Sequence, residues 1–131
     1  MSQPTIQNRK ARFEFHLLEC YEAGIALVGT EIKALRDGKA NLQDGYCFFH
    51  KGELLLKNMH ISEYRQAHFF NHEPKRTRKL LLKKQELRKL NAEVEAKGKT
   101  IVPTKLYINE KGLAKVEICL AKGKQAPDKR Q

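Results

Sequence analysis

The feature that most constrains this fold is an alternation of apolar and polar residues in short segments that are joined by turns. In the clearest case, Val116, Ile118 and Leu120 alternate with polar or small residues, and residues 101–108 form a second regular segment just before a turn at 109–112. A period of two is typical of a strand that buries one face. These segments therefore predict an antiparallel hairpin.

Similar patterns occur nearer the N-terminus. Residues 46–49 and 54–56 are apolar and aromatic runs separated by four turn-forming residues, which predicts a second hairpin. Residues 13–17 also alternate, and the pattern resumes at 25–27 after a glycine, which predicts either a hairpin or a bent strand. Residues 59–64 are expected to extend the sheet.

Two segments change to helical spacing. A short helix of ~2 turns is predicted from Thr30, a capping residue, to Gly38. Residues 65–77 are polar and contain a proline, which predicts a loop. A longer helix with a basic outer face is predicted from Thr77 to Gly98, because apolar residues recur there at helical spacing. They are Leu80, Leu87, Leu90 and Val94.

Hairpins interleaved with helices predict a mainly β fold with flanking helices. The expected architecture is an antiparallel OB-type β-barrel with two to three α-helices against it. The 131 residues suit one domain. We expect this domain at 9–121, with a flexible N-terminus at 1–8 and a basic, disordered C-terminal tail at 122–131.

The positive charge of the chain is large and concentrated. It has 26 Lys and Arg against 15 Asp and Glu, a formal net charge of +11, which indicates a polyanionic partner. The stretch from Lys75 to Lys89 carries much of this surplus and suits a phosphate track, although a solvated helix face is the alternative. Further basic sets at 8–12 and 122–130 favour a nucleic acid.

Several classes of protein are disfavoured. No apolar run approaches the ~18 residues of a spanning helix, so no membrane partner is expected. Cys20, Cys47 and Cys119 are odd in number and widely spaced, so we expect reduced, core or near-core thiols and a cytoplasmic protein. His68 and His72 are four residues apart, but no recognisable metal or nucleophile motif accompanies them. We therefore expect a binding protein without a cofactor rather than an enzyme.

Six blocks of the sequence occur in the order and spacing of the SmpB family, which the chain resembles over about residues 7–130. They are Asn8-Arg-Lys-Ala-Arg12, Tyr21-Glu-Ala-Gly24, Gly29-Thr-Glu-Ile-Lys-Ala-Leu-Arg36, Lys39-Ala-Asn-Leu-Gln-Asp44, Asn71-His-Glu-Pro-Lys-Arg-Thr-Arg-Lys-Leu-Leu-Leu82, and Ala121-Lys-Gly-Lys124 with Asp128-Lys-Arg130. The resemblance implies a monomeric protein that binds the tRNA-like part of transfer-messenger RNA and carries it to stalled ribosomes. A generic OB-fold binder of single-stranded nucleic acid and a metal-dependent nuclease are the alternatives.

The resemblance also implies particular RNA contacts. They fall on Asn8, Glu22, Leu81 and Lys115, with Lys10 and Arg12 as neighbours and with Lys75, Arg76, Arg78 and Lys79 from the basic run. Glu22 either accepts a hydrogen bond from a base or holds a basic neighbour in place. Leu81 either faces an unstacked base or belongs to the core.

The C-terminal residues are implied to contact the ribosome. They are Lys122, Gly123, Lys124, Asp128, Lys129 and Arg130. Family members usually continue with a charged tail that becomes helical in the messenger channel, whereas this sequence has Pro127 near its end and stops at Gln131. We therefore expect RNA binding to be retained and the ribosomal step to be weak.

Overall fold

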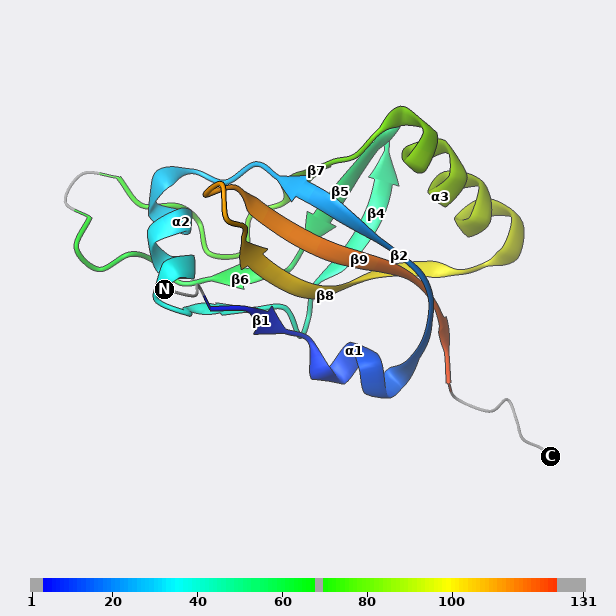
Figure 1. Ribbon diagram of the computed structural model, residues 1–131, viewed down its shortest axis with the longest axis horizontal. Coiled ribbons are helices and arrows are strands. Elements are labelled where there is room, and N and C mark those ends of the chain that lie inside the picture. The colour runs from blue at the N-terminus through cyan, green and yellow to red at the C-terminus, as the bar shows by residue number, and fades with distance from the viewer. Residues whose placement is uncertain (1–3, 68–69, 125–131) are drawn as a thin grey trace.

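The computed structural model describes residues 4–67 and 70–124 (Figure 1). In chain order the elements are β1 (Ile6–Gln7), α1 (Arg9–Glu14), β2 (Phe15–Ile25), α2 (Gly29–Arg36), β3 (Ala40–Asn41), β4 (Tyr46–His50), β5 (Glu53–Lys57), β6 (His60–Ile61), β7 (Arg78–Leu81), α3 (Lys84–Lys97), β8 (Thr100–Ile108) and β9 (Ala114–Gly123). Within these ranges, no helix is both long enough and apolar enough to cross a membrane.

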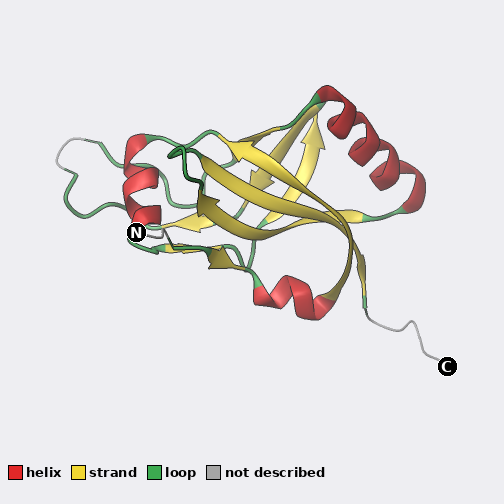
Figure 2. Ribbon diagram, viewed as in Figure 1, coloured by secondary structure: helices red, strands yellow, loops and turns green. Residues whose placement is uncertain are grey.

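Strands β8, β4, β5, β7, β2 and β9 are hydrogen-bonded in that order, and β9 pairs with β8 to close an antiparallel ring. Strand β1 pairs with Lys105 and Leu106 of β8, on the side of β8 away from β9. The helices lie outside the ring, at three separate places (Figure 2). The prediction of a mainly β fold with flanking helices is therefore confirmed, and the ring of strands is consistent with the OB type.

The predicted hairpins are present. Strands β4 and β5 pair from Tyr46↔Lys57 to His50↔Glu53. Lys51 and Gly52 between them have φ values of 51° and 81°, as a two-residue type I′ turn requires. Strands β8 and β9 form the C-terminal hairpin. Near the N-terminus, β2 is a single strand with an irregularity in its pairing with β9, so the bent-strand alternative is confirmed and the hairpin alternative is wrong. The strand begins at Phe15, however, because residues 13–14, which were expected in it, belong to α1.

The helix predicted from Thr77 begins later. Residues 78–81 form β7, which pairs with β5 and β2, and α3 starts at Lys84. Leu90 is fully buried in α3, whereas Leu80 and Leu81 alternate between the inside and the outside of the ring. The helical prediction failed here because the pairing partners of β7 are distant in sequence, and the local spacing of the leucines carries no information about them.

Two more boundaries differ from prediction. Residues 4–8 were expected to be flexible, but β1 pairs with β8 and Asn8 is buried. Residues 59–64 were expected to extend the main sheet, but β6 pairs with β3 in a separate two-stranded sheet. The described part of 65–77 contains no helix or strand, as predicted.

The core fills the ring, and α1 covers one end of its outer surface. Val116, Ile118 and Leu120 of β9 face the interior, following the predicted alternation. A second, smaller cluster joins Ala11 of α1 to Ala121 at the end of β9. This packing fixes the position of α1 beside β8 and β9, and with it the basic residues that α1 carries.

The cysteines differ from expectation. Cys47 is a buried free thiol, as predicted, and burial raises its pKa. Cys20 and Cys119, however, form a disulfide between β2 and β9. The two residues are 99 positions apart in sequence and directly opposite in the strand register. Only the pairing of the two strands brings them together, so sequence spacing could not reveal the bond.

Candidate RNA interface

Four residues from four neighbouring strands stand opposite one another on the outer face of the ring. Gly24 of β2 pairs with Leu81 of β7 on one side and with Lys115 of β9 on the other, and Lys115 pairs with Tyr107 of β8. Directly opposed residues in an antiparallel sheet point to the same face. We call these four residues the cross-strand row. Two of them, Leu81 and Lys115, are RNA contacts implied by the sequence resemblance.

Leu81 is exposed on this face. Its side chain is 53% exposed, whereas that of Leu80 is 2% exposed. The question that the sequence left open is therefore resolved against a core role, because a strand turns successive side chains to opposite faces. An exposed leucine next to a lysine is suited to contact a base while the lysine reaches a phosphate.

Gly24 keeps the centre of the cross-strand row open. A Cβ atom at this position would lie 3.4 Å from the Cβ and 3.7 Å from the Cδ1 of Leu81. A larger side chain would therefore cover the apolar surface of Leu81. In the sequence, Gly24 marks only a break between two strand-like segments. A glycine inside a strand pattern was the available signal for a close approach of another molecule.

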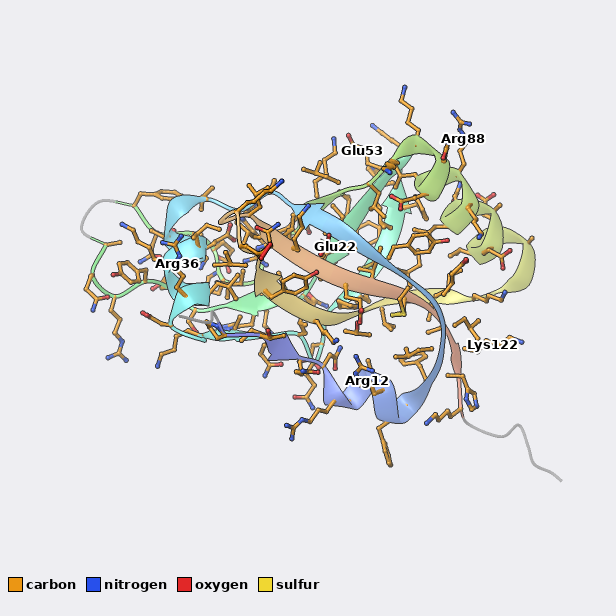
Figure 3. The ribbon with its side chains drawn as sticks, viewed as in Figure 1. Arg12, Glu22, Arg36, Glu53, Arg88 and Lys122 are labelled. Carbon is orange, nitrogen blue, oxygen red and sulfur yellow. A yellow bond between two sulfur atoms is a disulfide. The ribbon has the colours of Figure 1, made fainter. Side chains whose placement is uncertain are left out.

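A second line of residues lies beside the cross-strand row. Glu117 of β9 pairs with Glu22 of β2 and with Lys105 of β8. The hydroxyl of Tyr107 donates a hydrogen bond to Glu22, which lies over β2 and β9 in Figure 3. Burial, this bond and the charge of nearby Glu117 raise the pKa of Tyr107 to about 12. Tyr107 therefore stays protonated at neutral pH and orients the Glu22 carboxylate.

This arrangement answers the question about Glu22 in an unexpected way. The predicted alternatives were a contact with a base and a bond to a basic neighbour. Among the described residues Glu22 is bonded to Tyr107 rather than to a basic neighbour, and the contact with a base remains a prediction. Glu22 is exposed, so its carboxylate keeps a side open to solvent. The sequence patterns did not predict Tyr107 and Lys105 as parts of the interface. Both belong to β8, and the apolar residues of a strand indicate its buried face but not what its outer face contacts.

Positively charged side chains lie around the cross-strand row and the neighbouring line of Glu22, Glu117 and Lys105. The guanidinium of Arg12 on α1 lies 3.6 Å from the Glu117 carboxylate, and its side chain is 43% exposed. Within the described ranges, no carboxylate lies within ion-pairing distance of Lys10, Lys105 or Lys115. These lysines are therefore available for phosphates.

Asn8 has a structural role in this fold. Its side chain is 3% exposed, donates to the carbonyls of Leu42 and Pro103 at 3.3 and 2.8 Å, and accepts from the Ala11 N–H at 3.1 Å. With these bonds it caps the N-terminus of α1 and ties the helix to β8. In the chain without RNA, Asn8 therefore positions the basic residues of α1, and the RNA contact implied for it remains a prediction.

Arg78 is also a structural residue. It is fully buried, and its guanidinium lies 2.7 Å from the Glu31 carboxylate of α2. Arg76 pairs with the same carboxylate at 2.7 Å, and its side chain is 33% exposed. Arg78 also donates to three backbone carbonyls, those of Met59, Pro74 and Arg76. In the chain without RNA, the guanidinium of Arg78 is therefore held by Glu31 and by backbone carbonyls, and the RNA contact implied for Arg78 remains a prediction.

The basic run is therefore not one continuous track. Lys79 is exposed and pairs with Glu53 at 2.8 Å, and Lys75 is exposed beside β6 and β3. Positive side chains are spread over several faces, as Figure 3 shows for Arg36 on α2 and Arg88 on α3 at opposite ends of the molecule. The predicted contacts at Lys75, Arg76 and Lys79 remain predictions.

Part of the predicted tail is ordered. Lys122 and Gly123 belong to β9 and pair with His16 and Phe15 of β2. The Lys124 N–H donates to the Glu14 carbonyl at 2.9 Å. Disorder at 122–124 is therefore contradicted, because β2 extends far enough to pair with them. Asp128, Lys129 and Arg130 lie outside the described residues.

A bulky residue at Gly24 tests the cross-strand row. We expect Gly24→Leu to lower the affinity for a structured tRNA-like RNA by about tenfold or more, equivalent to ~1.4 kcal/mol, because the new side chain covers Leu81. Fluorescence anisotropy with labelled RNA measures this loss. Gly29→Leu is the matched control, because no atom lies within 4 Å of a Cβ at Gly29. Equal affinities of the two variants would remove Gly24 from the interface.

The sequence is similar to those of known proteins. The family model described as SmpB protein matches residues 5–131. An SsrA-binding protein of Desulforamulus reducens is 55% identical over 123 residues, which cover 94% of this chain and 76% of the relative. One from Christiangramia forsetii is 55% identical over 126 residues, which cover 96% of this chain and 80% of that protein.

A solved structure is similar as well. It is described as "tmRNA-SmpB: a journey to the center of the bacterial ribosome", and it aligns with a TM-score of 0.80 and 51% sequence identity. The alignment covers 98% of this chain and 90% of that chain. The family model and the relatives match nearly the whole sequence, including every strand of the ring, so this chain belongs to the SmpB family.

Proposed function

We propose that this protein is a non-enzymatic, cytoplasmic RNA-binding protein that binds the tRNA-like domain of transfer-messenger RNA. It then delivers that RNA to stalled ribosomes for trans-translation. The observation that carries the proposal is the cross-strand row, in which an exposed leucine, an open glycine and an unpaired lysine adjoin. The names of the relatives and of the solved structure, SsrA-binding protein and tmRNA-SmpB, support the choice of RNA.

The row suits a folded RNA whose loop presents unstacked bases. Leu81 provides an apolar surface for such a base, and Gly24 lets the RNA backbone or base come close to the strand. Lys115, with Lys105 and Arg12 beside it, provides charge for phosphates. Glu22, oriented by Tyr107, can accept a hydrogen bond from a base amino group or a 2′-hydroxyl.

A sequence-tolerant binder of single strands would need a different surface. Such proteins stack successive bases on several aromatic side chains in a basic groove. The cross-strand row has one aromatic residue, Tyr107, and its hydroxyl is held by Glu22. The aromatic pair Tyr46 and Phe48 lies on β4, which is not one of the strands that form the row. We therefore favour a structured RNA over an unstructured strand.

The ribosomal step is assigned to the C-terminal residues. Lys122 and Lys124 lie where β9 ends beside α1, so the chain leaves the domain close to Arg12. The residues proposed to contact the ribosome are Lys122, Gly123, Lys124, Asp128, Lys129 and Arg130. Because Lys122, Gly123 and Lys124 are separate from the cross-strand row, binding of transfer-messenger RNA and entry into the decoding site can use different parts of the protein.

Salt dependence tests the proposed function. We expect the logarithm of the affinity for transfer-messenger RNA to fall linearly with the logarithm of the salt concentration. We also expect Lys115→Ala to reduce the slope by ~1, because one phosphate contact is lost. Lys57→Ala, an exposed lysine of β5, is the matched control and should keep the wild-type slope. A slope of zero, or equal affinity for an unstructured RNA of the same length, would contradict the proposal.

A further inference from the structure

Cys20, Cys119 and Glu117 form a cluster next to the cross-strand row. Cys20 pairs with Cys119 in the register of β2 and β9, and Glu117 lies two residues before Cys119 on the same side of β9. The two sulfur atoms and a carboxylate oxygen of Glu117 all lie within 4.8 Å of one another. Sulfur and carboxylate ligands in such an arrangement can bind a metal ion once the two sulfurs are thiolates.

We propose that this cluster is a redox-gated site for a thiophilic divalent metal ion such as Zn²⁺. The disulfide closes the site, because a sulfur bonded to another sulfur is not a thiolate ligand. Reduction opens it by producing two thiolates beside the Glu117 carboxylate. The expectation that the chain meets reducing thiols rests on the proposed function, which assigns it to the cytoplasm.

The two cysteines differ in their exposure to solvent, which sets the order of reduction. Cys20 is exposed and Cys119 is fully buried. The thiolate of a small external thiol therefore attacks Cys20 Sγ, breaks the bond between the two sulfurs and releases Cys119 as a thiolate. A second external thiolate attacks the external sulfur of the mixed disulfide and releases the Cys20 thiolate. The two external thiols supply two electrons and leave as their own disulfide.

The donor set matches zinc. Two thiolates and one carboxylate supply three ligands of a tetrahedral site, and the exposed side of Cys20 leaves the fourth position to water. Zn–S bonds of ~2.3 Å and Zn–O bonds of ~2.0–2.2 Å place neighbouring donors ~3.5–4 Å apart in a tetrahedron, so the observed cluster needs only small side-chain rotations. A cation such as Mg²⁺ prefers oxygen ligands and would not be selected by the two sulfurs.

Neighbouring side chains hold Glu117 in place for this role. The Thr104 hydroxyl donates to Glu117 Oε1 at 2.5 Å and lies 3.8 Å from Cys119 Sγ. Arg12 lies 3.6 Å from the same carboxylate oxygen. Such outer contacts orient ligands in metal sites. A bound cation would also draw the Glu117 carboxylate away from Arg12.

Zinc titration of the reduced full-length chain tests the proposal. With excess reductant removed and a chromophoric chelator as competitor, we expect the reduced protein to bind one Zn²⁺ and the disulfide form to bind none. Cys20→Ser should lose this binding, and Glu117→Gln should weaken it ~10-fold or more. Cys47→Ser is the matched control, because Cys47 is buried elsewhere in the core, and it should bind as the wild type does.

A thiol count in denaturant tests the gate itself. A thiol-specific chromophore should detect one thiol before reduction, that of Cys47, and three afterwards. Three thiols before reduction would overturn the disulfide gate. Equal zinc binding by Cys20→Ser and the wild type, or no binding by the reduced wild type, would overturn the metal site. Neither measurement uses RNA, so its failure is distinct from a failure of the proposed function.

Discussion

Replacing Glu31 by glutamine is expected to lower the free energy of unfolding by about 3–5 kcal/mol. The carboxylate is fully buried and joins α2 to the segment before β7 through Arg76 and to β7 itself through Arg78. It also accepts the backbone N–H of Val28 at 2.9 Å and so caps the start of α2. A neutral amide would leave the buried guanidinium of Arg78 without a counter-charge, which costs more than the lost attraction alone.

Urea denaturation followed by circular dichroism measures this effect. Glu53→Gln is the matched control, because its carboxylate pairs with Lys79 on the surface, where both side chains are about half exposed. This variant should unfold at nearly the wild-type urea concentration, since exposed pairs contribute little. Similar midpoints for the two variants would show that the buried network does not stabilise the fold.

The same carboxylate predicts a pH dependence. Burial by itself would raise the pKa of Glu31, but the bonds from Arg76, Val28 and Arg78 outweigh it and hold the pKa below its ordinary value. A group with a lowered pKa in the folded state stabilises the fold above its unfolded pKa, ~4.3 for glutamate, and loses that contribution as the pH falls through the folded pKa. The wild type should therefore lose stability below about pH 4, and Glu31→Gln should lose less.

The neighbouring leucines Leu80 and Leu81 are expected to show opposite effects when each is replaced by alanine. Leu80→Ala should lower the free energy of unfolding by ~2–5 kcal/mol, because it leaves a cavity in the core. Leu81→Ala should leave stability nearly unchanged. It should weaken binding to transfer-messenger RNA by ~1–3 kcal/mol, because the proposed contact of its exposed side chain with a base is lost. Each variant is the size-matched control of the other.

Both quantities can be measured on the same preparations, by denaturation and by RNA titration at a protein concentration corrected for the folded fraction. A stable Leu81→Ala protein with wild-type affinity would remove Leu81 from the interface. A strongly destabilised Leu81→Ala protein would contradict its exposure in β7.

Much of the fold could be predicted from local patterns. The hairpins β4–β5 and β8–β9 follow from alternation and turn residues, and the buried stripe of α3 follows from helical spacing. The basic surplus indicated a nucleic acid without any knowledge of the surface. These features depend on residues close together in sequence, where periodicity reports directly which face is buried.

The sequence by itself determined a mainly β domain, an RNA partner and, through family resemblance, Leu81 and Lys115 as candidate contacts. Only the tertiary structure decided that Leu81 faces outward in a strand, that Asn8 and Arg78 are buried structural residues, and that Cys20 meets Cys119. The physical reason is the same in each case. Strand register joins residues that are distant in sequence, and a polar side chain can equally well satisfy a partner RNA or the buried backbone of its own fold.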